Sequence, residues 1–305
     1  MKDVLKHAVE AVNQVLLGKP QAVQLAVACI LARGHLLIED LPGLGKTTLS
    51  QALARVMGLS YQRIQFTSDL LPGDILGTSV FDRDSGSFVF HPGPIFAELI
   101  LADEINRATP KSQSALLEAM EEGQVTIDGA TRPLPQPFFV IATQNPASQG
   151  GTFNLPESQL DRFLMRLTLG YPAPAAEKML LQGETGRVRL DNLEPVMTRQ
   201  QLLTLQAMVP RVTATEAVID YILRLVTRSR ESHLCAWGLS PRASLGLLAA
   251  ARAWAMLEGR AYVIPEDVQA VFPAVVNHRL RASDDPAGHG GGALAQRLLA
   301  EVPAI

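Results

Sequence analysis

The segment HLLIEDLPGLGKTT at residues 35–48 decides the fold of this chain. Residues 35–39 form a short apolar run typical of a buried strand, and a helical pattern begins near Lys46. The loop between them contains Gly43 and Gly45, which let backbone N–H groups approach an anion. The start of the following helix directs the positive end of its dipole to the same place. The segment therefore predicts a nucleotide phosphate site.

Within this loop, Lys46 is expected to contact the β- and γ-phosphates, and the Thr47 hydroxyl to bind Mg²⁺. The usual pattern is Gly-x-x-x-x-Gly-Lys-Ser/Thr, but Asp40 occupies the position of its first glycine. A chance glycine turn at the surface is the alternative, and the strand and helix on either side disfavour it. The predicted binding loop comprises Asp40, Leu41, Pro42, Gly43, Leu44, Gly45, Lys46, Thr47 and Thr48.

Short apolar runs alternate with helical patterns across residues 1–172, which predicts an α/β domain with a parallel sheet covered on both faces. Two segments, 79–90 and 124–134, carry alternating apolar residues around Asp-Ser-Gly-Ser and Asp-Gly turns. Both are predicted to be β-hairpins inserted in this domain. Decoration of the sheet edge is the simpler interpretation of both inserts.

The pattern changes after residue 172. Residues 198–209, 213–230, 241–258 and 265–276 have helical spacing, and no strong strand follows. We therefore expect a small helical domain over residues 173–282. Residues 283–305 include a run of glycines at 290–292, which predicts a flexible C-terminal tail with at most a final helical turn.

Composition limits the classes of function. The 305 residues suggest two domains, and the 27 basic and 30 acidic residues leave a net charge of −3. A dedicated nucleic-acid binder usually has a basic surplus, so this balance disfavours one.

The two cysteines, Cys29 and Cys235, predict neither a disulfide framework nor a zinc site. The N-terminus lacks a signal-peptide pattern and no apolar run is long enough to span a bilayer, so we expect a cytoplasmic protein without membrane insertion.

Two apolar strands end in polar residues that suit phosphate hydrolysis. Residues 99–102 lead into Asp103 and Glu104, which are expected to bind Mg²⁺ and to polarise the attacking water, respectively. Residues 139–143 lead to Asn145, which would orient that water. Ligands of open parallel sheets bind at the carboxyl ends of the strands, where these side chains should meet. The alternatives are a helix-capping acid pair and an asparagine in a turn before proline.

Two arginines are further candidates. Arg162, in the segment QLDRF, is a candidate arginine finger that stabilises charge during phosphoryl transfer, and pairing with Asp161 is the alternative. Arg242 lies in the first turn of a predicted helix, where the helix dipole disfavours a cation. A nucleotide phosphate would offset that cost, and so would a carboxylate of the helical domain.

The segments LPGLGKTTL, LILADEINRA, ATQNP, LPESQLDRF and LSPRA resemble, in this order, the MoxR group of AAA+ ATPases over roughly residues 15–280. The resemblance implies an αβα domain with a helical lid that binds ATP and Mg²⁺. It assigns Asp103 and Glu104 to the Walker B pair, Asn145 to sensor 1, Arg162 to the arginine finger and Arg242 to sensor 2. It also places Leu17 and Gly18 against adenine.

The resemblance further implies a hexameric ring whose ATP sites lie between subunits, with both hairpins facing its pore. One subunit would bind ATP through Lys46, and its neighbour would supply Arg162. Members of the group are similar to chaperones that remodel client proteins, often with a von Willebrand A-domain partner. Alternatives are a magnesium-chelatase-like subunit, a nucleic-acid motor and a nucleotide-gated scaffold. Arg83 and Arg132 are balanced by nearby acids in the hairpins, which disfavours DNA binding.

Overall fold

The computed structural model describes residues 2–145, 152–182, 186–231, 235–282 and 291–304. Its centre is a five-stranded parallel sheet in the order β2-β5-β8-β1-β9. The predicted parallel sheet is thereby confirmed. Its strands are β1 (Leu36–Glu39), β2 (Tyr61–Gln65), β5 (Leu99–Asp103), β8 (Phe139–Gln144) and β9 (Met165–Leu167).

Helices cover both faces of this sheet, because successive strand side chains point to opposite sides. Leu36 and Ile38 of β1 join the apolar core that includes α1 (Lys2–Val15), α2 (Pro20–Leu31) and α3 (Lys46–Val56). Leu37, between them, joins the core on the other face with α4 (Pro72–Leu76) and α5 (Pro110–Glu122). Helices α3 and α5 therefore lie on opposite faces of the sheet. This separation decides where the catalytic candidates can meet.

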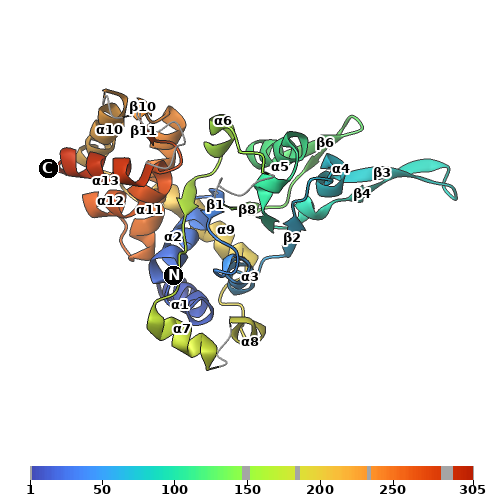
Figure 1. Cartoon of the computed structure of the whole chain (residues 1–305), viewed down its shortest axis with the longest axis horizontal. Helices are drawn as coiled ribbons and strands as arrows, with labels where there is room; N and C mark the ends of the chain where they lie inside the picture. The colour runs from blue at the N-terminus through green and yellow to red at the C-terminus, as the bar shows by residue number, and fades with distance from the viewer. Residues whose placement is uncertain (1, 146–151, 183–185, 232–234, 283–290, 305) are drawn as a thin grey trace.

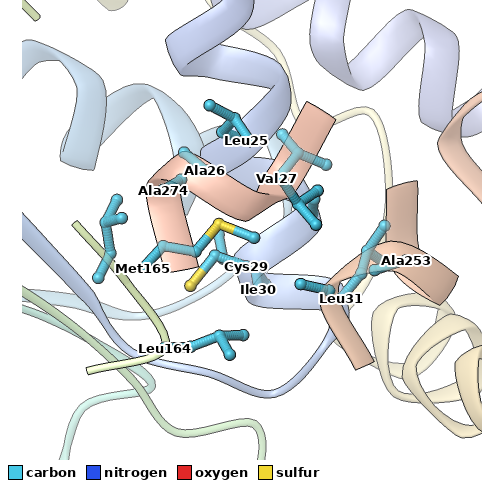
Figure 2. Close-up of a cluster of buried hydrophobic side chains, with 14 of the residues drawn as sticks. Leu25, Ala26, Val27, Cys29, Ile30, Leu31, Leu164, Met165, Ala253 and Ala274 are labelled. Carbon is cyan, nitrogen blue, oxygen red and sulfur yellow. The ribbon is translucent and has the colours of Figure 1, made fainter. Parts of the chain in front are cut away.

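Helix α2 is enclosed on nearly every side (Figure 2). Its side chains pack between Leu164 and Met165 at β9 and two alanines, Ala253 and Ala274, of helices that follow later in the chain. Cys29 lies within this cluster, where burial raises the pKa of its thiol and keeps it protonated. Helix α2 thus joins the sheet to the second group of helices.

The second group of helices comprises α10 (Glu216–Glu231), α11 (Pro241–Leu257), α12 (Pro265–Val276) and α13 (Gly291–Glu301). The predicted start of α11 is confirmed, since the Ser240 hydroxyl accepts a hydrogen bond from the Ala243 N–H at 3.1 Å. Helix α12 begins at Pro265, and the Asp267 carboxylate accepts from the Ile264 N–H at 2.9 Å. In the described part of the chain, no helix combines the length and apolarity that a membrane crossing requires.

Several elements differ from the prediction. The prediction of a flexible C-terminal tail is wrong for residues 291–301, which form helix α13. Leu294, Ala295 and Leu298 have helical spacing despite the preceding glycines, and they are buried in the core. The linker at 283–290 lies outside the described residues. Two short strands, β10 (Cys235–Trp237) and β11 (Arg281–Ala282), pair where no strand was expected.

The predicted helical region also begins with helices that lie along the first domain. These are α7 (Pro174–Leu181), α8 (Gly186–Asp191) and α9 (Arg199–Met208). Backbone N–H groups of Val196 and Met197 donate to Val56 at the end of α3, and the Gln206 amide donates to Ile30 O at 2.7 Å. The domain boundary at residue 173 stays a prediction. Short 3₁₀ turns occupy η1 (Pro94–Phe96), η2 (Ile105–Arg107) and η3 (Val209–Arg211).

Both predicted hairpins are confirmed. One is formed by β3 (Gly77–Asp82) and β4 (Ser87–Pro92), and the other by β6 (Gln124–Ile127) and β7 (Ala130–Pro133). Positive φ angles at Asp128 (51°) and Gly129 (76°) fit the tight turn expected of Asp-Gly. The two hairpins are joined by Arg132, whose guanidinium lies 3.9 Å from the Phe90 ring centre. Figure 1 shows the β3–β4 hairpin projecting away from the sheet.

His35 makes fold stability depend on pH. Its Nδ1 accepts from the Val140 N–H at 3.0 Å and its Nε2 lies 3.3 Å from Met120 O, so the ring is bound as a neutral imidazole. Burial lowers its pKa to about 4. Below pH 6.5 the unfolded chain takes up a proton that the folded chain does not, so stability falls as pH decreases from 6.5 toward 4.

We expect His35 to account for about 3 kcal/mol of this loss. Denaturant titrations of the wild type and His35→Gln at several pH values measure it, because the variant lacks the titrating ring. The variant should lose less unfolding free energy than the wild type over this range. Equal losses in both proteins would contradict the assignment.

Candidate active site

The phosphate loop connects β1 to α3 with two glycines in the left-handed region. Gly43 has φ 82° and Gly45 has φ 93°, a conformation that side chains with a Cβ rarely adopt. A Cβ at Gly45 would also lie 2.8 Å from Leu16 Cδ1. The loop residues Leu41–Gly43 are exposed, whereas Lys46 is buried and donates to Asp40 O at 2.6 Å. The predicted strand–loop–helix context is thus present.

Asp40, which replaced the expected glycine, fastens this loop to the sheet. Its Oδ2 accepts from the backbone N–H groups of Leu169 (2.7 Å) and Gly170 (2.6 Å), just beyond β9. Its Oδ1 accepts from the Leu41 N–H at 2.9 Å. The side chain is 6% exposed, so a charged acceptor with three donors is held in a largely dry place. Asp40 therefore fixes the entry of the loop from a residue far away in the sequence.

Substituting Asp40 by Ala should lower the free energy of unfolding by about 3 kcal/mol, since hydrogen bonds to a charged group contribute about 1.5–3 kcal/mol each and are not additive. It should also weaken ATP binding, because the loop loses its anchor. Chemical denaturation and nucleotide titration measure the two effects. Asp40→Asn keeps an acceptor oxygen and should lose less of both. An alanine variant as stable as the wild type would contradict this role.

Asp103 ends the fully buried strand β5, next to β8. Its Oδ1 accepts from the Thr143 hydroxyl at 2.6 Å, and its Oδ2 accepts from Arg63 Nη2 at 2.6 Å. The same Thr143 oxygen accepts from the Glu104 N–H at 2.8 Å. Thr143 thus holds both acids in register with β8. The edge of the sheet brings together the acids that the sequence predicted.

Glu104 adopts φ 56° and ψ 48°, a left-handed conformation that is uncommon for a residue with a side chain and that often occurs at functional sites. Its Oε1 accepts from Asn145 Nδ2 at 2.9 Å. Its Oε2 accepts a hydrogen bond from Gln65 Nε2 at 3.3 Å and forms an ion pair with Arg107, whose Nε lies 2.9 Å away. The carboxylate is therefore oriented by two hydrogen-bond donors and one ion-pair partner, which come from three different elements.

Asn145 is 2% exposed and lies directly after β8. Its backbone oxygen accepts from Asn106 Nδ2 at 3.2 Å. Its side-chain oxygen Oδ1 has no hydrogen-bond partner among the described residues. A buried acceptor without a partner, beside a carboxylate, is suited to a water molecule that donates to both. This geometry agrees with the predicted positions of Glu104 and Asn145.

Lys46 shares this site with the acids. Burial lowers the pKa of its ammonium group, and three acidic charges oppose that shift, those of Asp103, Asp40 and Glu104. The hydroxyl of Thr47 and the carboxylate of Asp103 are hard oxygen ligands of the kind that Mg²⁺ prefers. Mg²⁺ usually takes few protein ligands and completes its shell with waters and phosphate oxygens, so these residues fit a Mg²⁺–nucleotide complex.

Arg162 and Arg242 lie away from Lys46 and both contact Glu121 of α5. Arg162 Nη2 lies 2.9 Å from Glu121 Oε2, and its Nη1 donates to Leu117 O at 2.6 Å. Arg242 pairs with the other oxygen of Glu121. Both arginines thus contact α5, on the face of the sheet opposite α3 and Lys46. Asp161, the partner suggested for Arg162, instead accepts from Arg279 at 2.7 Å.

Leu17 and Gly18 form the turn between α1 and α2. Gly18 has φ 74°, and a Cβ there would lie 3.1 Å from Ala176 of α7. Leu16, immediately before this turn, lies against Gly45 of the phosphate loop. The turn therefore lies between the phosphate loop and α7, a position that suits contact with a nucleotide base.

The sequence indicated the main acids but not the residues that orient them. Arg63, Gln65, Arg107 and Thr143 all contact Asp103 or Glu104. Each lies at or near the end of a strand, and these ends meet at the same edge of the sheet. Their positions next to apolar strands in the sequence are the signal from which they could have been predicted. Glu121, which joins the two arginines, gave no signal, since it is one of several acids on α5.

Comparisons with known proteins agree with this arrangement. Residues 35–165 match the ATPase family associated with various cellular activities (AAA), and residues 227–301 match the AAA lid domain. A crystal structure from Cytophaga hutchinsonii, described as a "putative ATPase", superposes with a TM-score of 0.89 at 36% identity, covering 99% of this chain and 95% of the other. Fold and site together define an AAA+ ATPase domain followed by a helical lid.

The relatives narrow this class. Chaperone MoxR1 of Mycobacterium tuberculosis is 42% identical over 285 residues, which cover 90% of this chain and 75% of that protein. Uncharacterized protein YeaC of Bacillus subtilis is 47% identical over 277 residues, which cover 91% and 87%. Protein MoxR of Paracoccus denitrificans is 32% identical over 299 residues, which cover 90% and 88%. The chain belongs to the MoxR family of AAA+ ATPases.

Proposed function

We propose that this protein hydrolyses ATP in a Mg²⁺-dependent reaction and uses the cycle to remodel or activate a partner protein. The observation that carries the ATPase proposal is the group formed by Lys46, Asp103, Glu104 and Asn145 at one edge of the sheet. It combines a phosphate-binding cation with an oriented general base. The names of MoxR relatives, including a chaperone, support the remodelling role.

In this proposal, Lys46 and the backbone of residues 40–48 hold the phosphates, and Leu17 and Gly18 line the base. Asn145 Oδ1 and the Glu104 carboxylate orient the attacking water, and Glu104 accepts its proton. When bound, Mg²⁺ neutralises charge on the phosphate oxygens next to Thr47 and Asp103. The 2.9 Å contact between Asn145 Nδ2 and Glu104 Oε1 at the edge of the sheet supports the two roles proposed around the water.

The proposed site is completed by a second copy of the chain. Arg162 and Arg242 lie with Glu121 on the face opposite Lys46, so a neighbouring subunit is better placed to offer them to the γ-phosphate than the same chain. This supports a ring of identical subunits, which we propose to be hexameric. A cytoplasmic location and a von Willebrand A-domain partner belong to the same proposal.

Affinity capture tests the remodelling role. The Glu104→Gln variant, which should bind ATP without hydrolysing it, serves as bait in Mg²⁺–ATP and, separately, in Mg²⁺–ADP. We expect specific client proteins to be retained with ATP and released with ADP. Lys46→Ala, which should not bind nucleotide, is the control. Capture of the same proteins by all three samples would count against nucleotide-controlled binding of a client.

A further inference from the structure

The tip of the β3–β4 hairpin exposes apolar side chains on both of its faces. Val80 pairs with Val89, and Phe81 pairs with Phe88. Adjacent pairs point to opposite faces of a two-stranded sheet, so each face carries one of them. These side chains are 49%, 41%, 52% and 73% exposed, respectively. We call these four residues the hairpin tip.

Stabilisation of the hairpin itself does not account for this exposure. The rings of Phe81 and Phe88 meet edge to face at 5.4 Å, a contact that stabilises paired strands. Phe90, on the same face and closer to the sheet, is covered by Arg132 and lies 6.0 Å from the Phe96 ring. The base of the hairpin is thus packed, while its projecting end (Figure 1) is left open. Apolar patches of this kind mark interaction sites.

The charge around the hairpin selects the kind of partner. Residues 67–97 contain Asp69, Asp74, Asp82 and Asp84 but only Arg83 among basic residues, which gives 1 − 4 = −3. The Ser85 hydroxyl and the Asp84 N–H hold the pKa of Asp82 below its usual value, so this acid is ionised at neutral pH. Nucleic acid would be repelled. A second copy of the hairpin would meet its own charge.

We propose that the hairpin tip binds an extended polypeptide segment in which apolar side chains alternate with lysine or arginine. In such an extended segment the apolar side chains lie on one face, where they would cover Phe81 and Phe88. The basic side chains lie on the other face, which is that of Asp82, and would pair with Asp82 and Asp84. The hairpin pairs with no other strand in the described part of the chain, so its outer edges can accept a further strand. This inference rests on the proposed function, because the segment would belong to the client.

Three fluorescein-labelled peptides of about twelve residues test the proposal by fluorescence anisotropy with the full chain. The first alternates valine and phenylalanine with lysine. The second replaces lysine with glutamate, and the third replaces the apolar residues with serine. We expect the first peptide to bind and the serine peptide to bind at least about tenfold more weakly, since burying one aromatic side chain is worth about that factor. The glutamate peptide should also bind more weakly than the first, because its carboxylates would meet Asp82 and Asp84.

Variants locate the binding on the molecule. Phe81→Ser combined with Phe88→Ser should weaken binding of the lysine peptide by about tenfold or more. Asp82→Asn with Asp84→Asn should also weaken it and reduce its salt dependence. Leu223→Ser, at an apolar residue of α10 that is 51% exposed, is the matched control and should bind as the wild type does. Basal ATP hydrolysis should stay unchanged in the serine variants.

Each alternative gives a different result. Failure of the wild type to bind the lysine peptide while it hydrolyses ATP would overturn this inference and leave the proposed ATPase intact. Peptide binding without ATP hydrolysis would reject the proposed function instead. Equal binding of the glutamate peptide would contradict the charge argument. If the Phe81/Phe88 variant lost oligomeric mass by light scattering but kept peptide affinity, the tip would be a contact between copies, and the inference would be wrong.

Discussion

Replacing Glu104 by Gln is expected to lower kcat for ATP hydrolysis by about 10²–10⁴-fold, the range that a positioned general base contributes. The amide has nearly the same shape and keeps an oxygen that can accept from Asn145 Nδ2, so the site should stay assembled. It cannot take a proton from water. ATP affinity should therefore be retained, and steady-state phosphate release together with nucleotide titration measures both quantities.

Glu118→Gln is the matched control for this experiment. Glu118 is an exposed glutamate on α5, outside the group of acids at the sheet edge. Its substitution removes the same charge and should leave kcat unchanged. Normal turnover by Glu104→Gln would mean that another residue activates the water, and the role of Glu104 as the base would have to be abandoned.

Replacing Arg162 by Ala should reduce kcat by about 10³-fold or more, because an arginine finger contributes about 10³–10⁵ to phosphoryl transfer. Its guanidinium is close to that of Arg242 at Glu121, so both can be presented together to a neighbouring site. The chain's own phosphate loop lies at the edge of the sheet and leads into α3, on the face opposite α5, so its ATP affinity should be kept.

Arg162 also donates to Leu117 O, so the loss must be separated from a folding defect. Thermal unfolding of Arg162→Ala and of Arg162→Lys provides this check. The lysine variant keeps the charge but not the planar, forked geometry, and should recover only part of the rate. Arg297→Ala, at an exposed arginine on α13, should behave as the wild type. Full activity of Arg162→Ala would remove it from the mechanism.

Much of this site could be predicted because its residues follow apolar strands. The segments ending at Glu39, Asp103 and Thr143 are buried parallel strands, so the residues after them must meet at one edge. Local pattern alone therefore predicted the neighbourhood of Lys46, Asp103 and Glu104. It also predicted both hairpins from their turn residues.

The remaining features depend on contacts between distant segments. Asp40 departs from the usual glycine pattern, and the local sequence does not indicate its bonds to Leu169 and Gly170. Nothing near Glu121 in the sequence indicates that two arginines converge on it. Helix α13 was missed because its glycine-rich start outweighed the spacing of Leu294 and Leu298. Sequence periodicity reports local structure, whereas these arrangements depend on the tertiary packing.

The position of Asp40 also gives the phosphate loop a mechanical role in the proposed cycle. Its carboxylate ties the loop to Leu169 and Gly170, the segment that leads from the sheet into α7. Gly18 packs against Ala176 of the same helix. A nucleotide bound between the loop and this turn would therefore contact both sides of the path from the sheet to the helical region. Changes at the phosphates would therefore act directly on the segment that leads into α7.

Mixing the two inactive variants tests the shared site most directly. In rings assembled from equal amounts of Glu104→Gln and Arg162→Ala chains, half of the sites keep Glu104 and half of their neighbours supply Arg162. Random assembly should therefore restore about a quarter of the wild-type ATPase rate, as expected for heterologous contacts in a closed ring. Neither variant alone should approach this rate. No recovery in rings shown by mass spectrometry to contain both chains would contradict a site completed by the neighbouring subunit.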